Sequence, residues 1–210
     1  NVILDFTLND KNTLSFSSTV MVSPNKSYEN KVNGEIFNAQ QELDSLFITN
    51  SYLKNDATNL SFNLEHLIDF EEEGSDLKTL VNFIKYDNNQ TQNLNTNYNL
   101  PSGELTNNVS FYTDAEQDSD IFTGQIDYTK IICEGDFETG LKYSNIETES
   151  ALDFYNIENN IHNYIEDNSD LFVYTEAIYA GYLNYSKSWE KWNINAGLRG
   201  EFTNVKGDSK

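Results

Sequence analysis

The stretch Trp192-Asn-Ile-Asn-Ala-Gly-Leu-Arg-Gly-Glu-Phe-Thr203 decides the fold class, because it alternates apolar and polar residues over six periods. Successive strand side chains point to opposite faces, so the pattern predicts a strand with one apolar and one polar face. A second run, Leu171 to Ser186, is rich in Tyr, Leu, Ile and Ala. Together the runs predict a hairpin whose strands exceed the ~5–6 residues usual in soluble sheets and match the ~9–11 that cross a bilayer.

The composition favours an all-β protein with polar loops. The chain has 210 residues, enough for one sizeable domain, and 13% of them are aromatic. Disordered chains are poor in aromatic and β-branched residues, which argues against disorder. Asn is the commonest residue and Thr is frequent, whereas a helical protein would use more Ala, Leu, Glu, Lys and Arg.

The formal net charge of −21 argues against a nucleic-acid partner, because phosphate contacts need clustered Lys and Arg. Residues 86–129 and 143–186 contain acidic residues but no Lys or Arg. Two interpretations stay open at this point. The acids are solvated loop charges, or they form an outer surface that cations bridge.

Targeting and cysteine signals are few. Cys133 is the only cysteine, so no intrachain disulfide forms and the compartment cannot be deduced from it. The sequence contains no secretory signal and no run of 18 apolar residues, so no transmembrane helix is predicted. Strands that cross a membrane alternate and escape such a search. The chain opens without Met in strand-like sequence, and we expect it to be a piece of a longer protein.

Tight-turn signals recur at intervals of roughly sixty residues, each between alternating runs. Polar connections rich in Asn, Asp, Ser and Glu separate the resulting hairpins. One short and one long end per hairpin is typical of an outer-membrane barrel, whereas a soluble sandwich turns every ~8–12 residues. We expect turns at 9–12, 71–76, 133–136 and 187–191, and long connections at about 23–54, 87–119 and 148–170, with short strand continuations at Glu35–Asn38 and Gln92–Tyr98.

Four segments carry a family resemblance. The chain resembles the outer-membrane β-barrel family of TonB-dependent receptor-like proteins in Bacteroidota. The likeness is clearest from about Asp118 to the end and weaker from Leu4 to Tyr86, and Ala196-Gly-Leu-Arg-Gly-Glu-Phe-Thr203 is its most specific part. The segments are Phe122–Thr129, Phe137–Ser144, Ile178–Ser186 and Ala196–Thr203.

This resemblance implies an antiparallel up-and-down transmembrane barrel of about 22 strands around an N-terminal plug. Residues 1–210 would be a partial barrel domain of about four long hairpins, without the plug, the energy-coupling segment or the closing strand. Two places depart from the family pattern. Lys130–Cys133 stands where a proline-containing turn is usual, and His66 and Leu67 stand where an aromatic and a polar residue are favoured.

Catalytic signals are weak, and we predict no enzyme and no catalytic residue. His66 and His162 are the only histidines and fall in different predicted hairpins. Cys133 falls in a predicted turn without a neighbouring His or metal ligand. Phosphate loops, zinc spacings and nucleophile motifs are not found in the sequence.

The segment Asp114-Ala-Glu-Gln-Asp-Ser-Asp120 places four carboxylates at alternate positions. Calcium prefers several oxygen ligands, which alternate loop residues supply. The central Gly and terminal Glu of the helix-loop-helix calcium motif are missing. On a strand, the same acids would instead face a wet lumen. We therefore predict no cofactor, with loop calcium as the alternative.

Aromatic residues flank two of the predicted turns. Trp189 and Trp192 flank the fourth turn, and Tyr128 and Tyr143 flank the third. Amphipathic rings prefer the headgroup level of a membrane, which predicts an aromatic girdle. The alternative is ordinary aromatic packing in a soluble sheet.

Three functions follow from these patterns. The first, which the resemblance implies, is a TonB-dependent receptor of the cell outer membrane that takes up a scarce nutrient, with lipid and a TonB-type coupling protein as partners and an outer-membrane lipoprotein as a further candidate. The second is a barrel that anchors partner proteins without import, and the third is a soluble carbohydrate-binding sandwich. The ligand-binding residues stay unassigned. Candidates for the lumen side are Gln125, Asp127, Glu138, Lys142, Asn195, Arg199 and Glu201.

Overall fold

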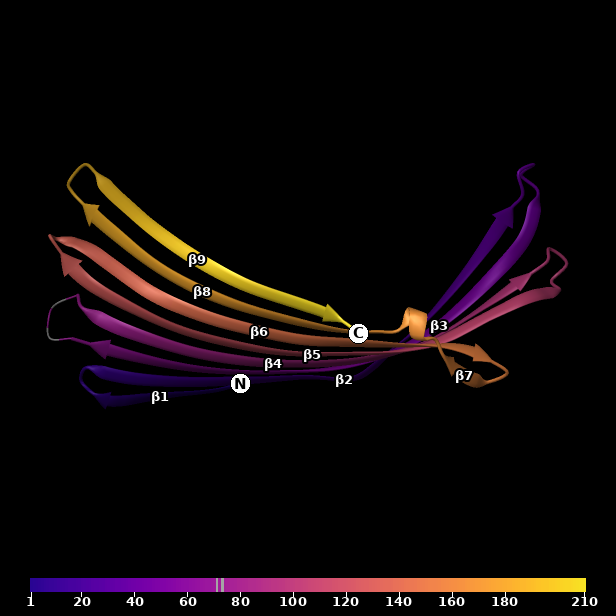
Figure 1. Ribbon diagram of the computed structural model, residues 1–210, viewed down its shortest axis with the longest axis horizontal. Helices are drawn as coiled ribbons and strands as arrows, with labels where there is room; N and C mark the ends of the chain where they lie inside the picture. The colour runs from indigo at the N-terminus through magenta and orange to yellow at the C-terminus, as the bar shows by residue number, and fades with distance from the viewer. Residues whose placement is uncertain (71, 73) are drawn as a thin grey trace.

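The computed structural model describes residues 1–70, 72 and 74–210 as one nine-stranded antiparallel sheet (Figure 1). The strands neighbour one another in chain order, except that the short β7 pairs only with β6. In this described part, no helix is long and apolar enough to cross a membrane. The elements are β1 (Val2–Asn9), β2 (Asn12–Phe37), β3 (Leu43–Asp69), β4 (Asp76–Asn99), β5 (Leu105–Ile132), β6 (Gly135–Glu158), β7 (Ile161–Tyr164), the 3-10 turn η1 (Glu166–Asn168), β8 (Asp170–Ser188) and β9 (Asn193–Ser209).

The four predicted tight turns lie between β1 and β2, β3 and β4, β5 and β6, and β8 and β9. In the third, Cys133 and Glu134 have φ angles of 51° and 59°. Positive φ at both central residues is the mark of the two-residue turn whose twist suits a hairpin. Residues 71 and 73 of the second predicted turn lie outside the described residues.

The predicted long connections are wrong, because most of their residues are strand. β3 and β4 pair without a register shift from Leu46 opposite Asn99 to Asp69 opposite Asp76. Asn and Ser are poor local signals for a strand, but here polar side chains bond across the ladder. The Oγ1 atoms of Thr49 and Thr96 are 2.9 Å apart.

The long strands therefore have two parts: one near the four tight turns, and an extension beyond it. β2 to β6 contain 24 to 28 residues, well above the ~9–11 that cross a bilayer. In β2 the register shifts between Ser23 and Lys26, around Pro24. Such a bulge bends a strand, and proline is tolerated at a sheet edge because its missing N–H breaks no ladder bond. Figure 1 shows β2–β5 turning upward on the right, away from the broad sheet on the left.

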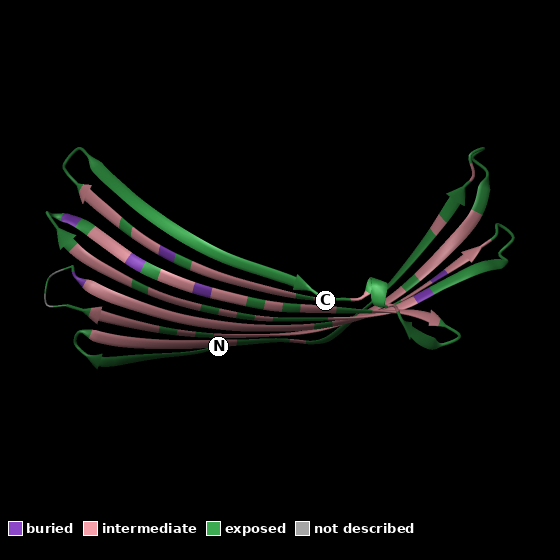
Figure 2. Ribbon diagram, in the orientation of Figure 1, coloured by how far each residue is buried: buried purple, intermediate pink, exposed green. Residues whose placement is uncertain are grey.

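The pairing register assigns each side chain to one of two faces, because directly opposed residues point the same way. One face, called the apolar face below, carries most of the large hydrophobic side chains near the four turns. They stay open to the surroundings, for example Leu198 at 73% exposure, and Figure 2 shows few buried positions. Members of the apolar face are Leu14, Phe16, Phe62, Leu64, Val81, Phe83, Phe122, Ile126, Leu141, Tyr143, Tyr179, Leu183, Leu198 and Phe202.

The sheet is open at both sides. Within the described residues, β1 pairs only with β2 and β9 pairs only with β8. Among the residues that the structure describes, Ala180 is the single buried hydrophobic one, at 6% exposure. A sheet of this kind has no core of its own, so its apolar face needs an external apolar medium.

Candidate functional site

The seven predicted lumen-side residues all lie on the face opposite the apolar face, which is called the polar wall below. The register places Gln125 opposite Lys142, and Arg199 opposite Tyr182. Asp127 lies opposite Lys78 on one side and Gly140 on the other. The wall spans β4, β5, β6, β8 and β9 as one surface.

A hydrogen-bonded group lies at the centre of the polar wall. The Tyr182 hydroxyl contacts the Asp127 carboxylate, and its oxygen is 3.3 Å from Glu138 Oε1. Gln125 Nε2 donates to Asp127 Oδ2 at 2.8 Å. A Cβ at Gly140 would clash with Asp127 and with the Tyr182 ring, so the missing side chain makes room for this contact.

Ion pairs extend the wall to both sides of this group. Lys78 Nζ is 2.9 Å from Glu65 Oε2, and Arg199 is 2.8 Å from Glu201. The sequence reasoning missed Tyr182, Lys78 and Glu65. The alternation of Ala180, Tyr182 and Asn184 in β8 would have assigned Tyr182 to the wall.

Replacing Tyr182 with phenylalanine is expected to lower the stability of the full-length protein by about 1–2 kcal/mol. The substitution removes the hydroxyl that serves two carboxylates; a hydrogen bond to a charged group contributes roughly 1.5–3 kcal/mol, and water that reaches the carboxylates of the variant replaces part of what is lost. Urea unfolding in lipid vesicles measures the change. Tyr179→Phe, on the opposite face of β8, is the matched control. Equal unfolding midpoints for Tyr182→Phe and wild type would contradict the assigned role.

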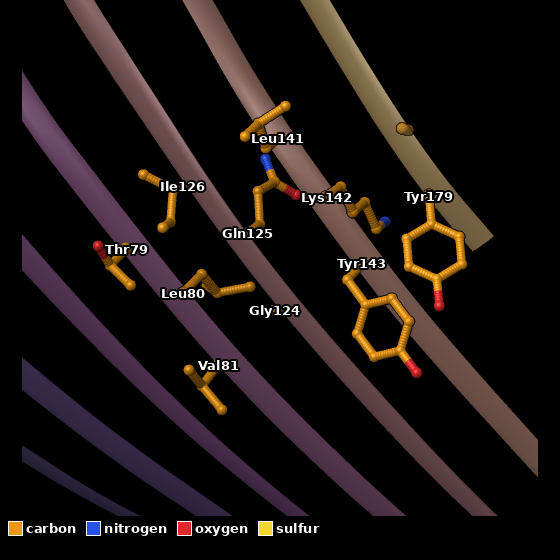
Figure 3. A pocket seen from close by; sticks show the side chains of 11 residues that line it. Thr79, Leu80, Val81, Gly124, Gln125, Ile126, Leu141, Lys142, Tyr143 and Tyr179 are labelled. Atoms are coloured by element: carbon orange, nitrogen blue, oxygen red, sulfur yellow. The ribbon is translucent and has the colours of Figure 1, made fainter. Parts of the chain in front are cut away.

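The apolar face contains a shallow hollow of about 430 Å³ centred on Gly124 (Figure 3). Val81 and Tyr143 lie directly opposite Gly124 on the two neighbouring strands. A Cβ at Gly124 would meet only Phe122 ring atoms, at 3.8 Å, so the space is open. Four residues of the opposite face also line the hollow: Leu80, Gln125, Lys142 and Ala180. Because side chains alternate between the two faces, these residues contribute main-chain atoms to the hollow and not side chains.

Aromatic side chains occupy both ends of the apolar face. Trp189 and Trp192 lie in the β8–β9 turn as predicted, and Tyr128 packs edge-on against Phe70 at 6.1 Å. The prediction that Tyr143 flanks the third turn is wrong, because the register places it opposite Gly124, well along the hairpin. Tyr143 instead joins a cross-strand row at the far end, with centroid separations of 6.3, 5.0 and 6.3 Å along Phe122, Tyr143, Tyr179 and Phe202.

A charged border follows this aromatic row on the same face. Asp120 lies opposite Lys85 and Glu147, and Asp118 lies opposite Asp87 and Glu149. The four acids of the segment 114–120 therefore lie on strand β5 beyond the apolar face, not in a loop and not on the polar wall. Among the described residues, no group of three or more His, Cys, Asp or Glu side chains is arranged to hold a metal ion. The prediction of no cofactor, with loop calcium as the alternative, stays untested.

Charged side chains that lie opposite one another in this border alter one another's pKa. Lys85 Nζ is 3.6 Å from both Asp87 Oδ1 and Asp120 Oδ1, and these charges raise the pKa of Lys85. A hydrogen bond shared with the Asp87 carboxyl, some loss of hydration and the Asp87 charge raise the pKa of Asp118. The folded protein thus holds this proton more tightly than the unfolded chain. Stability falls as the pH rises from the ordinary aspartate pKa through the raised one.

Asp118→Asn is therefore expected to stabilise the full-length protein at neutral pH. The gain is about a few tenths of a kcal/mol, because water and salt screen exposed like charges. It should shrink as the pH falls below the ordinary aspartate range, where both carboxyls are protonated. Unfolding midpoints between pH 3 and pH 7 measure this, with Asp56→Asn on β3 as control. A gain that is independent of pH would refute the repulsion.

The histidines and the cysteine are not brought together. His66 lies on the apolar face of β3 between Leu14 and Thr79, and its Nε2 is buried without a hydrogen-bond partner among the described residues. His162 lies in β7, 5.2 Å from the Tyr112 ring, and Cys133 is exposed in its turn. These positions assemble no nucleophile–base pair.

The height of the apolar face matches a membrane. On β6 it runs from Phe137 to the first border acid, Glu147, a rise of about 33 Å along the strand. At a tilt of ~45° this covers about 23 Å, close to the ~25 Å apolar band of an outer-membrane barrel. The sequence model of the outer membrane protein beta-barrel family matches residues 68–210, more than half of the chain.

The chain belongs to the outer membrane protein beta-barrel family. It therefore resides in the cell outer membrane, as predicted, and the predicted all-β, up-and-down barrel class is confirmed. In barrels of this family, the apolar face meets lipid and the polar wall faces the interior. No curated protein matches the chain.

Proposed function

We propose that this barrel segment forms part of the wall of a TonB-dependent outer-membrane transporter that takes up a scarce nutrient. The observation that supports import is the connected polar wall. It carries both signs of charge and a tyrosine hydroxyl shared by two carboxylates, Asp127 and Glu138. Such a lining gives a hydrated solute hydrogen-bond partners along the barrel interior.

The extensions of β2–β5 support capture at the cell surface. β5 continues from the border residue Asp120 to Leu105, about 50 Å of further strand. We place these extensions on the extracellular side, because outer-membrane barrels have short periplasmic turns and long external segments. The proposed partners are outer-membrane lipid, a TonB-type coupling protein that acts on a plug in the full-length protein, and an outer-membrane lipoprotein.

Import is tested by nutrient depletion from a defined medium. Three strains are compared: one that produces the full-length protein, one that lacks it and one that lacks the TonB-type protein. Mass spectrometry follows a mixture of oligosaccharides, ferric siderophores and cobalamin in the medium. A compound depleted by the first strain alone supports energy-coupled import, and equal depletion by all three refutes it.

Anchoring of partner proteins is the second candidate function. Large apolar side chains stay exposed on the extension of β2, including Tyr28, Val32 and Phe37 at 55%, 45% and 54%. Exposed apolar residues in one region favour a protein contact. Co-purification of the same outer-membrane proteins at fixed stoichiometry, with no import, would favour this candidate.

A further inference from the structure

Beyond the charged border, a hollow of about 770 Å³ lies between the extensions of β2–β5 and the β6–β7 hairpin. Asn50, Asn95 and Ser110 form one cross-strand row in it, and Tyr52 and Asn93 belong to the next row. The hairpin contributes Ile157 and Asn160, far along the chain. This hollow is separate from the polar wall, because its rows lie on the face that continues the apolar face.

Most of the residues that line this hollow are polar, and their charges balance. Amides and hydroxyls dominate, and the only charged members, Glu29 and Lys31, have opposite signs. An asparagine side chain offers two donors and one acceptor, and a serine hydroxyl offers one donor and accepts. Groups of this kind match a ligand with many neutral hydroxyls better than an anion or a metal ion.

A line of tyrosines begins inside the hollow. Tyr52 lies in the same cross-strand row as Asn93, Tyr112, Tyr155 and Tyr164. The ring centroids of Tyr112 and Tyr155 are 5.8 Å apart, and those of Tyr155 and Tyr164 are 5.5 Å apart. Aromatic rings present a flat apolar surface with a polar tip. A sugar ring has the complementary shape, with an apolar face of C–H groups and hydroxyls around its edge.

We propose that this hollow binds a neutral oligosaccharide. Sugar rings stack on Tyr52 and its row, and the amides of Asn93 and Asn95 bond their hydroxyls. A peptide strand would instead join the open edge of β2 at Glu29–Lys31, where β2 pairs only with β3 among the described residues, and its binding would depend on that main-chain edge rather than on the Tyr52 and Asn93 side chains. The sugar comes either from free oligosaccharide or from the saccharide part of lipopolysaccharide in the same leaflet. The proposal is independent of import.

The test uses full-length protein in detergent on an array of neutral and acidic oligosaccharides, and on micelles of purified lipopolysaccharide. Wild type is expected to bind neutral sugars. Tyr52→Ala and Asn93→Ala should each weaken that affinity about tenfold, the loss that follows from one missing stacking or hydrogen-bonding partner. Binding to free sugars indicates free oligosaccharide as the ligand, and binding only to lipopolysaccharide indicates its saccharide part. Either result supports the site.

Controls separate binding from folding. Asn59→Ala, on the opposite face of β3, should bind as wild type does, and Tyr52→Phe should keep most of the stacking. Each variant must retain the boiling-dependent gel shift of a folded barrel. The proposal is overturned if wild type binds no neutral oligosaccharide, if the Tyr52 and Asn93 variants bind as wild type does, or if a displayed peptide library yields the only ligands.

Discussion

Leu141→Arg is expected to destabilise the full-length barrel by about 2–4 kcal/mol, the usual cost of a basic side chain on the lipid face near the bilayer midplane. Leu141 lies midway between Phe137 and Asn145, on the stretch of β6 that spans the apolar face, and it is 69% exposed within the sheet. The arginine would therefore meet acyl chains rather than protein. Urea unfolding in lipid vesicles measures the loss.

The control is Gln125→Arg, one strand away on the polar wall (Figure 3). There the new charge meets water, with the Asp127 carboxylate beside it and Lys142 directly opposite, so attraction and repulsion largely offset and we expect a change below about 1 kcal/mol. Equal losses for the two variants would mean that both faces meet the same medium. The assignment of the apolar face to lipid would then be wrong.

Residues 1–210 expressed alone are expected to give no folded monomer in detergent. In the described part of the chain, β1 and β9 each leave one row of main-chain groups unpaired, and a hydrocarbon medium supplies no hydrogen bonds to them. Such edges also pair readily with other chains. Sedimentation and a gel run with and without boiling should show aggregate and no mobility shift.

Full-length protein, refolded in parallel under the same conditions, is the control for this experiment. It should give a monodisperse species whose mobility changes on boiling. A monodisperse, heat-modifiable species of 24.1 kDa from residues 1–210 would contradict the expectation and show that the two edges tolerate detergent unpaired.

Alternation along single strands predicted the membrane part of the fold. The run Trp192–Thr203 separates Leu198 from Arg199 in the structure as it does in the sequence, since a side chain's face depends only on its own strand. For the same reason, all seven lumen-side candidates share one face. Turn positions were also predictable, because residues such as Asn9 and Gly135 act within a few positions.

The extensions beyond the membrane were not predictable in this way. Six of the thirteen residues at 87–99 are Asn, which is depleted in strands, so the segment reads locally as a loop. Their strand form depends on β3 and β5 lying on both sides, and side chains such as Gln92 and Ser51 bond across the ladder at 2.9 Å. That stabilisation comes from partners forty residues away.

The sequence by itself determined that this protein is a two-faced antiparallel sheet of outer-membrane type, because alternation and turn chemistry are local properties. Only the tertiary structure decided which strand residues lie side by side. It placed the Tyr182 hydroxyl against Asp127 and Glu138, moved Tyr143 to the far end of the apolar face, and assembled the hollow around Tyr52. The physical reason is that cross-strand register is set by pairing between distant segments and cannot be deduced from any one strand.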